Sequence, residues 1–417
     1  MSEFLFWFSL VGLVYLYAGY PCLVRLLAKL RPMQRRKEPQ QTPVSVVIAC
    51  YNESDRIVNK LSALLATEQS SQIAEILVGS DGSTDRTVDL LSQLDDERIR
   101  VFPFAERRGK PAVLNELIPL CRSEIVVLCD ARQTLSEQAI PDLVANFADD
   151  SVGVVSGELK FRREGNTSTA KRGIGAYWHY EKLIRKSESR YRGVPGATGA
   201  LYAIRRSLFR PIPPSTLLDD VVIPMQAIAQ RGRCVFEPNA IAWDTPSKSL
   251  SHEAIRKRRT IAGAAQLVVN HPGWLLPWRN PIWFEYVSHK IVRLASPLLL
   301  IAVAITNALL LDQPLYRVLG LLHLGFYASA AIGWICQRTG RPALLFGLQF
   351  MFLTLNVTTL VALFDAVRGR FQVTWQRPGD NGVHRRPPAN SSPTRQASGH
   401  RPTTGGWPTG PARPSEL

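Results

Sequence analysis

Four long apolar runs constrain the fold of this chain more than any other feature. One covers residues 4–30, and the other three cover residues 294–311, 315–335 and 343–364. About 20 apolar residues span a bilayer as a helix, so we expect this 417-residue chain to be an integral membrane protein. The first run has no basic stretch before it and no cleavage site after it, which favours a membrane anchor over a cleaved signal peptide. Burial inside a soluble protein does not suit the length and number of the other three.

Basic residues indicate which side of the membrane the chain occupies. Six of them lie in or just after the end of the first run: Arg25, Lys29, Arg31, Arg35, Arg36 and Lys37. Such residues stay in the cytoplasm, so we expect the domain after Lys37 to be cytoplasmic and the protein to lie in the cell membrane. The end of the chain conflicts with this rule. Three crossings would put the tail outside, whereas Arg368, Arg370 and Arg377 favour the cytoplasm. Either one apolar stretch does not cross or the tail breaks the rule.

Between the apolar runs, residues 43–270 alternate strand and helix patterns. Strand patterns cover residues 44–50, 75–79, 99–104, 124–131, 152–157 and 234–244, and helix patterns cover residues 57–68, 86–94, 110–121, 171–192 and 250–269. This alternation predicts an α/β domain with a mostly parallel, Rossmann-type sheet. Ligands bind beyond the carboxyl ends of such strands. Because Tyr51, Asp81 and Asp130 each stand at the end of a strand, we expect one binding edge that contains all three.

The composition excludes several classes of function. A net charge of +16 points to nucleic acid, anionic lipid or phosphorylated ligands. The basic residues are spread along the chain and no nucleic-acid module is present, so we expect no nucleic-acid partner. The six cysteines lie far apart without a CxxC pair, which argues against a zinc site or a disulfide framework. The seven histidines show no metal-ligand spacing. Protein partners are not indicated.

Asp219 and Asp220 are the most informative polar pair. They come after a proline-rich turn and open a mostly apolar segment. By themselves they indicate the start of a helix, where carboxylates suit the positive end of the helix dipole. Other segments give them a second meaning: the acidic turn SDGSTD, the strand that ends at Asp130, the loop GATGA and the basic cluster at residues 256–259. Together these segments are suited to binding a sugar diphosphate and deprotonating a hydroxyl group.

The order of seven segments resembles that of the membrane-bound family 2 glycosyltransferases, which include cellulose, chitin, hyaluronan and poly-N-acetylglucosamine synthases. The segments are PVSVVIACYNE, VGSDGSTDRT, RRGKPAVLNEL, VVLCDAR, GATGALYAIRR, LLDDVV and RKRRTIAG, and they cover about residues 43–263. Each motif is weak alone, but the ordered set is specific. The resemblance implies a GT-A-like domain and a nucleotide-sugar donor, with UDP as the expected nucleotide.

The pattern and the resemblance together divide the chain into five regions. Residues 1–30 are expected to form an N-terminal transmembrane anchor, and residues 43–270 the GT-A-like glycosyltransferase domain. Residues 271–293 contain five Trp, Phe and Tyr residues between prolines; they form either an interfacial segment or an aromatic core. Residues 294–366 are expected to hold about three transmembrane helices. Residues 378–417 are rich in Pro, Ser, Thr, Arg and Gly, which predicts a disordered tail.

The resemblance assigns the donor site to the strand ends. Asp81 is expected to accept a hydrogen bond from the base, although family members often carry a second acid where this chain has Ser80. The alternative is a tight turn capped by aspartate. Tyr51 and Glu53 are expected beside the nucleotide. Lys110 matches a family lysine near the nucleotide, and the alternative for it is a solvated surface cation.

Asp130 is the expected metal ligand. The family's Asp-x-Asp motif places a carboxylate on a divalent ion that bridges the diphosphate, and Mg²⁺ or Mn²⁺ suits oxygen ligands. In this chain Arg132 occupies the third position of the motif. A guanidinium group cannot bind a cation, so we expect Arg132 to contact a phosphate directly. The metal would then have fewer protein ligands.

The resemblance makes Asp220 the general base, with Asp219 orienting it. Direct displacement with one base inverts the anomeric centre, and general-base catalysis contributes about 10²- to 10⁴-fold. Gly196, Gly199 and Ala200 are expected to let the acceptor sugar approach the backbone. The alternative for them is an ordinary loop before a strand.

RKRRT aligns with the family's Gln-Arg-x-Arg-Trp box. Lys257 and Arg259 are expected to bind the diphosphate, with anionic lipid as the alternative ligand. Thr260 replaces the tryptophan that stacks near the acceptor in the family. This departure weakens the case for processive synthesis.

We therefore expect an inverting membrane glycosyltransferase that transfers a sugar to a carbohydrate or lipid-linked acceptor during envelope or extracellular polysaccharide synthesis. Two alternatives remain: single transfer to a lipid, and a non-catalytic nucleotide-sensing scaffold. Arg132 supports the scaffold, whereas the presence of Asp81, Asp130 and Asp220 together opposes it. A transporter is disfavoured because the apolar spans hold almost no charged residues.

Overall fold

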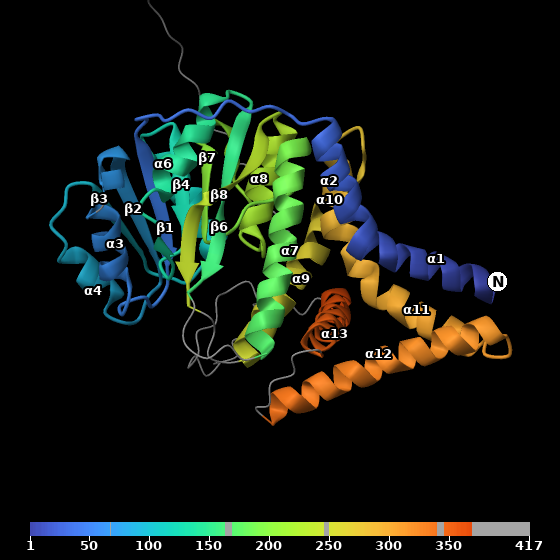
Figure 1. The fold of residues 1–417 in the computed structure, drawn as a ribbon. Coiled ribbons are helices and arrows are strands. Elements are labelled where there is room, and N and C mark those ends of the chain that lie inside the picture. The colour runs from blue at the N-terminus through green and yellow to red at the C-terminus, as the bar shows by residue number, and fades with distance from the viewer. Residues whose placement is uncertain (67, 163–168, 246–249, 340–345, 369–417) are drawn as a thin grey trace, which may run out of the picture. The chain divides into compact units, whose positions relative to one another are not determined.

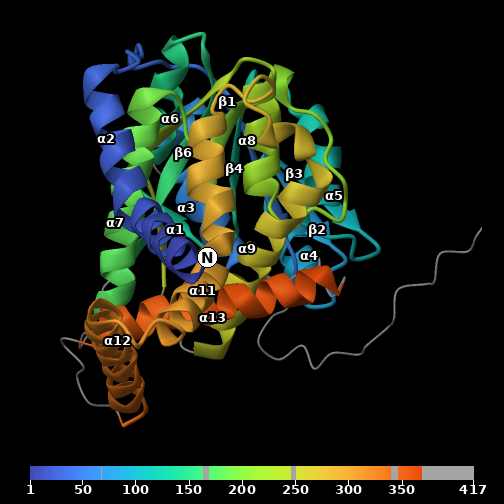
Figure 2. The same ribbon diagram turned by 90° about the vertical axis from the view of Figure 1, so that its right-hand side faces the viewer.

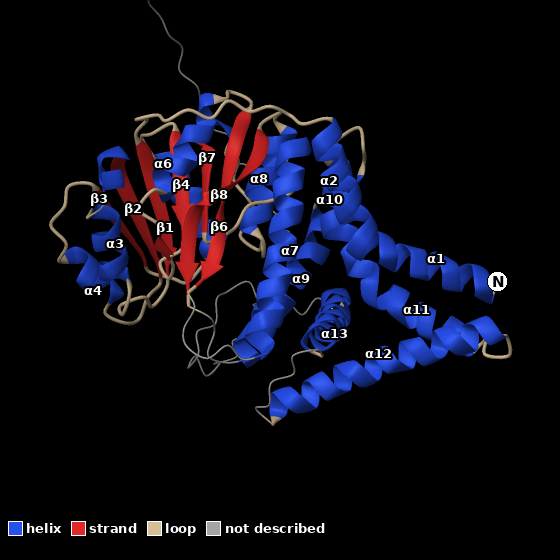
Figure 3. Cartoon of the chain, in the orientation of Figure 1, coloured by secondary structure: helices blue, strands red, loops and turns tan. Residues whose placement is uncertain are grey.

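An eight-stranded sheet forms the centre of the α/β domain (Figures 1 and 3). Its order is β3-β2-β1-β4-β7-β6-β8-β5. The strands are β1 (Val44–Cys50), β2 (Ile73–Asp81), β3 (Ile99–Phe104), β4 (Ile125–Cys129), β5 (Thr134–Leu135), β6 (Val152–Phe161), β7 (Leu201–Arg205) and β8 (Arg233–Asp244). β1 to β4 pair in parallel, as do β6 and β8, whereas β7 is antiparallel to both of its neighbours. The predicted α/β fold with a mostly parallel sheet is confirmed.

The computed structural model describes residues 1–66, 68–162, 169–245, 250–339 and 346–368, without the side chains of residues 68–69, 169–177, 250–257 and 367. The predicted disordered tail over residues 378–417 lies outside this description. All the described residues belong to one compact unit, Met1–Trp375.

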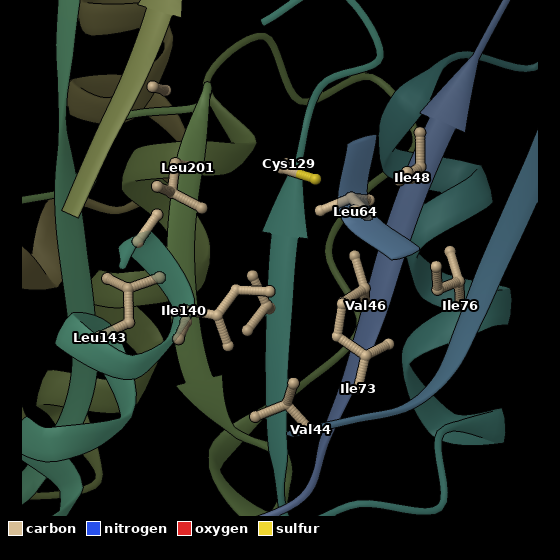
Figure 4. Close-up of a cluster of buried hydrophobic side chains, with 14 of the residues drawn as sticks. Val44, Val46, Ile48, Leu64, Ile73, Ile76, Cys129, Ile140, Leu143 and Leu201 are labelled. Carbon is tan, nitrogen blue, oxygen red and sulfur yellow. The ribbon is translucent and has the colours of Figure 1, made fainter. Parts of the chain in front are cut away.

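Helices cover both faces of the sheet. α3 (Ile57–Leu65) and α6 (Ala139–Val144) pack on one face, and α5 (Lys110–Leu117) and α8 (Asp219–Ala229) pack on the other. Figure 4 shows the first face, where Val46 and Ile48 of β1 meet Leu64 and Ile140. The intervening β1 residue, Val47, packs into the opposite cluster. Burial on both faces explains the nearly continuous apolar run of this strand.

Several predicted boundaries agree with the structure and others shift. β1 and β3 span the predicted residues. The strand predicted over residues 152–157 continues to Phe161, because β6 pairs with β8 over its whole length. The helix predicted over residues 57–68 ends at Leu65. α4 (Thr87–Ser92) is shorter than its predicted range of residues 86–94.

Among the described residues, four helical segments are long and apolar enough to cross a membrane: Ser2–Leu30, Trp283–Ala308, Pro314–Arg338 and Gly347–Ala366. The first consists of α1 (Ser2–Val14), a π-helical turn at Tyr15–Gly19 and α2 (Tyr20–Leu30). The second runs from α10 (Trp283–Tyr286) through an irregular helical stretch into α11 (Ser296–Ala308), and the last two are α12 (Pro314–Arg338) and α13 (Gly347–Val367). The predicted apolar helices are therefore present.

The aromatic segment over residues 271–293 does not behave as one unit. Trp274 packs against the cluster that contains α5 and α8, and Tyr286 is fully buried in the same cluster. Trp278 is 76% exposed. Trp283 begins the second membrane-length segment. Part of the segment thus forms an aromatic core, which was one of the two predicted alternatives.

Two long helices connect the sheet domain to the apolar helices (Figure 2). α7 (Thr169–Tyr191) lies along α2, where the Tyr20 hydroxyl donates a hydrogen bond to buried Glu188. α9 (Leu250–Asn270) contacts α13 through an ion pair between Arg258 and Asp365. The apolar helices are therefore packed directly against the domain.

Candidate active site

The acidic pair lies at the start of α8, and α9 fixes the chain in front of it. Asp219 and Asp220 are the first two residues of α8. The Leu217 N–H group donates to Oε1 of Gln266 at 3.0 Å, and Nη2 of Arg259 donates to the Leu217 carbonyl at 3.4 Å. The predicted helix start is correct. The acidic pair lies at the carboxyl edge of the sheet, where ligands bind in such folds. This position allows the pair a chemical role, and the contacts from α9 hold the chain just before it.

The glycine-rich loop at residues 196–200 contacts Asp220 directly. The Gly199 N–H group donates to Oδ2 of Asp220 at 3.1 Å, and the Ala197 N–H group donates to its backbone carbonyl at 2.7 Å. Gly196 has a φ of 119°, a conformation that favours glycine. Ala200 is buried. The structure thus brings the predicted acceptor loop and the predicted base together.

Gly199 leaves room for the carboxylate. A Cβ atom there would lie 3.0 Å from Oδ2 of Asp220. We expect Gly199→Ala to displace the Asp220 side chain and to lower kcat about 10-fold, a loss of about 1.4 kcal/mol in transition-state stabilisation. Steady-state kinetics on the purified full chain tests this.

Gly325→Ala is the matched control, because a Cβ atom at Gly325 meets nothing within 4 Å. It is expected to leave kcat unchanged. A Gly199→Ala variant as active as this control would show that the loop does not position Asp220.

Lys110 joins two carboxylates. Its Nζ lies 2.8 Å from Oδ1 of Asp130 and 3.4 Å from Oδ2 of Asp219, and its side chain is only 9% exposed. Burial lowers the pKa of Lys110, but the negative charges of Asp130 and Asp219 outweigh burial and raise the pKa above its ordinary value. The lysine therefore stays charged. It is not the solvated surface cation that was the alternative.

The environment of Asp220 suits a general base. Burial, followed by the negative charge of Asp219, raises the pKa of Asp220 from 3.8 to about 6. Lys110 and Lys290 oppose this shift. A carboxylate whose pKa lies closer to neutral pH is a stronger base than an ordinary aspartate and is still ionised at pH 7.

The raised pKa predicts the pH dependence of transfer. Asp220 accepts a proton only when ionised, so kcat/KM is expected to fall about 10-fold for each pH unit below about 6 and to level off above it. Initial rates between about pH 4.5 and 8, corrected for protein unfolded at each pH, measure this limb on both sides of the expected pKa. A kcat/KM that stays constant down to about pH 4.5, as expected for an aspartate with the ordinary pKa of 3.8, would indicate that Asp220 does not experience this environment.

Asp81 anchors the loop that leads into α5. Its two carboxylate oxygens accept hydrogen bonds from the backbone N–H groups of Arg108 and Gly109, both at 2.8 Å, and the residue is 1% exposed. Gly109, at a φ of 93°, turns the chain directly into Lys110. Asp81 thus positions Lys110. The base of a nucleotide could donate to Asp81 only through the remaining lone pairs of its carboxylate oxygens.

The loops after β1 and β2 complete the carboxyl edge of the sheet, where the nucleotide is expected. The Arg107 guanidinium group stacks on the Tyr51 ring, with its central carbon 3.7 Å from the ring centroid. The Glu53 N–H group donates to Oγ1 of Thr87 at 2.8 Å. Oδ1 of Asn52 accepts a hydrogen bond from the Thr84 N–H group at 2.8 Å. Tyr51, Glu53 and Asp81 therefore gather at the carboxyl edge of the sheet, as predicted from the strand ends.

Arg132 has a protein partner. Its guanidinium group forms an ion pair with Asp244, the last residue of β8, which is 3% exposed. Nε2 of Gln133 also donates to Asp244, at 3.1 Å. The sequence reasoning did not single out Asp244. Its position at the end of a strand was the available signal, because Tyr51, Asp81 and Asp130 were found in the same way.

Asp130 is the carboxylate that suits a divalent cation. Its side chain is 34% exposed, and Lys110 contacts Oδ1. Among the described residues no group of three or more His, Cys, Asp and Glu side chains could hold a metal. Mg²⁺ commonly takes one or two carboxylates together with substrate phosphates and waters. The residues therefore fit a cation that is held jointly with a diphosphate.

The remaining predicted site residues lie on α9. Arg259 contacts the chain before α8, and Thr260 is exposed. The side chain of Lys257 lies outside the described residues. The structure thus places Arg259 against the chain just before the acidic pair, while the expected contact between Lys257 and the diphosphate stays a prediction.

Arg185 of α7 is a residue that the sequence reasoning missed. Its guanidinium group donates to Oγ1 of Thr198 at 2.6 Å and to Oγ of Ser156 at 2.7 Å, and it stacks on the Phe236 ring. It therefore links the loop at residues 196–200 to β6. No sequence signal marks it, because it occupies an ordinary position in a helical pattern.

The order and direction of the strands, with helices on both faces of the sheet, define a GT-A-like fold. Among solved structures, the mannosyltransferase PcManGT from Pyrobaculum calidifontis, in complex with GDP-Man and Mn²⁺, matches 89% of this chain and 100% of its own with a TM-score of 0.66 and 20% identity. Residues 45–212 match the family model described as Glycosyl transferase family 2. Over these residues the chain is therefore similar to family 2 glycosyltransferases.

Two curated relatives are enzymes of polysaccharide synthesis. The poly-beta-1,6-N-acetyl-D-glucosamine synthase of Staphylococcus aureus (strain MSSA476) is 25% identical over 205 residues, which cover 48% of this chain and 49% of that protein. The same enzyme of Staphylococcus epidermidis (strain ATCC 35984) is 24% identical over 253 residues, 58% of this chain and 60% of that protein. The chain thus spans about half the length of the curated relatives it matches.

Proposed function

We propose that this protein is an inverting membrane glycosyltransferase. It moves a sugar from a nucleotide-diphosphate donor, with UDP as the expected nucleotide, to a carbohydrate acceptor during envelope or extracellular polysaccharide synthesis. The similarity to poly-N-acetylglucosamine synthases supports this kind of product. The observation that carries the proposal is the Asp220 carboxylate, held by Gly199 beside the Lys110–Asp130 ion pair.

The geometry supports a direct displacement. Asp220 removes the proton from an acceptor hydroxyl group as its oxygen attacks the anomeric carbon and the bond to the diphosphate breaks. Attack from the face opposite the leaving group inverts the anomeric centre, so an α-linked donor gives a β-linked product. Burial and the negative charge of Asp219 raise the pKa of Asp220. The loop at residues 196–200 receives the acceptor.

The leaving group meets positive charge on the donor side. Lys110 contacts Asp219, Arg259 contacts the chain at Leu217, and Lys257 is expected to join them. Mg²⁺ or Mn²⁺, when bound, neutralises the departing diphosphate, and Asp130 would hold it. Arg132 is paired with Asp244, so its contact with a phosphate requires it to leave or share that partner.

We also propose that the sheet domain faces the cytoplasm. Six basic residues between Arg25 and Lys37 mark the end of the first apolar helix, and such residues favour the cytoplasmic side. Nucleotide sugars are available there. The protein then lies in the cell membrane as a multi-pass protein.

The proposed function is tested with the purified full chain in lipid nanodiscs. Radiolabelled nucleotide sugars are screened for transfer and hydrolysis, with Mn²⁺, with Mg²⁺ and with a chelator. A long labelled polymer supports polysaccharide synthesis. A single labelled glycolipid supports the alternative, which the exposed Thr260 in place of a stacking tryptophan favours. Binding of a nucleotide sugar without transfer or hydrolysis would support the sensing scaffold and contradict the proposal.

A further inference from the structure

We propose that α13 lies along the cytoplasmic surface of the bilayer and does not cross it, so that the chain crosses three times and its tail is cytoplasmic. The partner of α13 is then the boundary between anionic lipid headgroups and acyl chains. The proposal rests on the proposed cytoplasmic position of the sheet domain. It resolves the conflict between the number of apolar runs and the basic residues after the last one.

Two contacts mark the end of the crossing helices that lies away from the sheet domain. Nε2 of Gln313, just before α12, donates to Oε1 of Glu3 in α1 at 2.8 Å. Nε1 of Trp7 donates to the Tyr316 hydroxyl group at 3.1 Å. The N-terminus and the turn between α11 and α12 therefore lie at one end, which Figure 1 shows on the side away from the sheet. The segment α1–α2, α11 and α12 each run between this end and the domain.

α13 lies at the opposite end of the crossing helices, next to the domain. In its middle, Oδ1 of Asn356 accepts a hydrogen bond at 2.6 Å from Ser296, the first residue of α11. Near its end, Asp365 pairs with Arg258 of α9. At its start, a Cβ atom on Gly333, close to the end of α12, would lie 2.5 Å from the Phe346 carbonyl oxygen. The middle and the end of α13 thus contact residues next to the domain, and its start contacts the last part of α12.

The two views agree with this placement. Figure 1 shows α12 along its length and α13 end-on, whereas Figure 2 shows α13 along its length and α12 foreshortened. α13 therefore runs across the direction of the crossing helices. Several of its large apolar side chains are nevertheless exposed: Leu348, Val357, Leu360, Val361 and Phe364. Exposed apolar side chains on a helix beside membrane spans need lipid to cover them.

Charge gives an independent argument. Basic residues flank α13 on both sides: Arg338 and Arg341 precede it, and Arg368, Arg370 and Arg377 come after it. The far end holds Glu3 and Asp312 with the single basic side chain of Arg317. A crossing helix separates its flanks, so one basic flank would lie outside and violate the positive-inside rule. With α13 at the surface, both flanks stay cytoplasmic, where they attract anionic lipid.

Cysteine accessibility tests the proposal. The background is the full chain with Cys22→Ser and Cys336→Ser, because the other four native cysteines are buried. Single cysteines are introduced as Asp312→Cys at the far end, Asp95→Cys in the sheet domain and Ser392→Cys in the tail. A membrane-impermeant maleimide is added to intact spheroplasts and, separately, to permeabilised ones. We expect only Asp312→Cys to react in intact spheroplasts, and all three to react after permeabilisation.

The pattern of labelling separates the two proposals. If Ser392→Cys reacts in intact spheroplasts while Asp95→Cys is protected, α13 crosses the membrane and the inference is wrong. If Asp95→Cys and Ser392→Cys both react, the cytoplasmic orientation is wrong but both positions still share one side, as inferred. Protection of all three cysteines in intact spheroplasts, with reaction after permeabilisation, would contradict the three crossings.

Discussion

Asp220→Asn is expected to lower the rate of sugar transfer about 10²- to 10⁴-fold, the usual contribution of a general base, while affinity for the nucleotide sugar stays close to that of the parent protein. The amide fills the same space and still accepts the hydrogen bond that the Gly199 N–H group donates. It cannot take a proton from the acceptor. Single-turnover transfer and equilibrium donor binding, measured on the same preparation, test the two halves of this result.

Asp95→Asn is the matched control, since Asp95 is exposed in a loop of the same domain. It is expected to change neither quantity. The pH limb near 6 should also disappear in Asp220→Asn, because the group that titrates is gone. Unchanged transfer in Asp220→Asn would remove Asp220 from its proposed role. A parallel loss of donor affinity would instead assign Asp220 to donor binding.

The strand runs were the part of the fold that the sequence predicted best. The bounds of β1 and β3 can be located from short apolar runs between polar turns, a signal that depends only on neighbouring residues. The direction of β7 was not predictable in this way. The alternation of side chains along a strand is the same in either direction, so its antiparallel place between β4 and β6 depends on long-range pairing.

The sequence predicted the positions of the candidate site residues better than it predicted which residues they contact. Asp81 and Asp130 stand at predicted strand ends, and the resemblance added Asp220 at a predicted helix start; the structure places all three at one edge of the sheet. Lys110 stands in a polar string, which gives no sign of burial. The Gly109 turn directs it inward, and its partner Asp219 belongs to α8, far along the chain. Such pairings need the folded sheet.

For the membrane topology, hydropathy and the contacts in the structure point to different conclusions about α13. Hydropathy alone selects α13 as a membrane span, because the scale measures composition and takes no account of neighbours. The basic residues on both sides of α13 are in conflict with a crossing, which hydropathy does not register. The contacts of Asn356 with Ser296 and of Asp365 with Arg258 supply a reason for the contradiction.

Lys110→Met is expected to destabilise the folded protein by about 3–5 kcal/mol, the usual cost of removing one partner from a buried ion pair. Methionine is close in size to the lysine side chain but leaves Asp130 and Asp219 without their cation. Thermal or chemical unfolding in detergent measures this effect. Lys186→Met is the control, because Lys186 is exposed on α7. It is expected to leave stability unchanged.

The same substitution should move the pH limb upward. Lys110 lowers the pKa of Asp220, so its removal raises that pKa above about 6 and extends the loss of activity toward neutral pH. Adding Asp219→Asn to Lys110→Met removes one uncompensated carboxylate and the neighbour whose charge raises the pKa of Asp220. The double variant is therefore expected to recover part of the stability and to shift the limb back down. A Lys110→Met protein with parental stability and an unmoved limb would show that this lysine does not hold the carboxylates together.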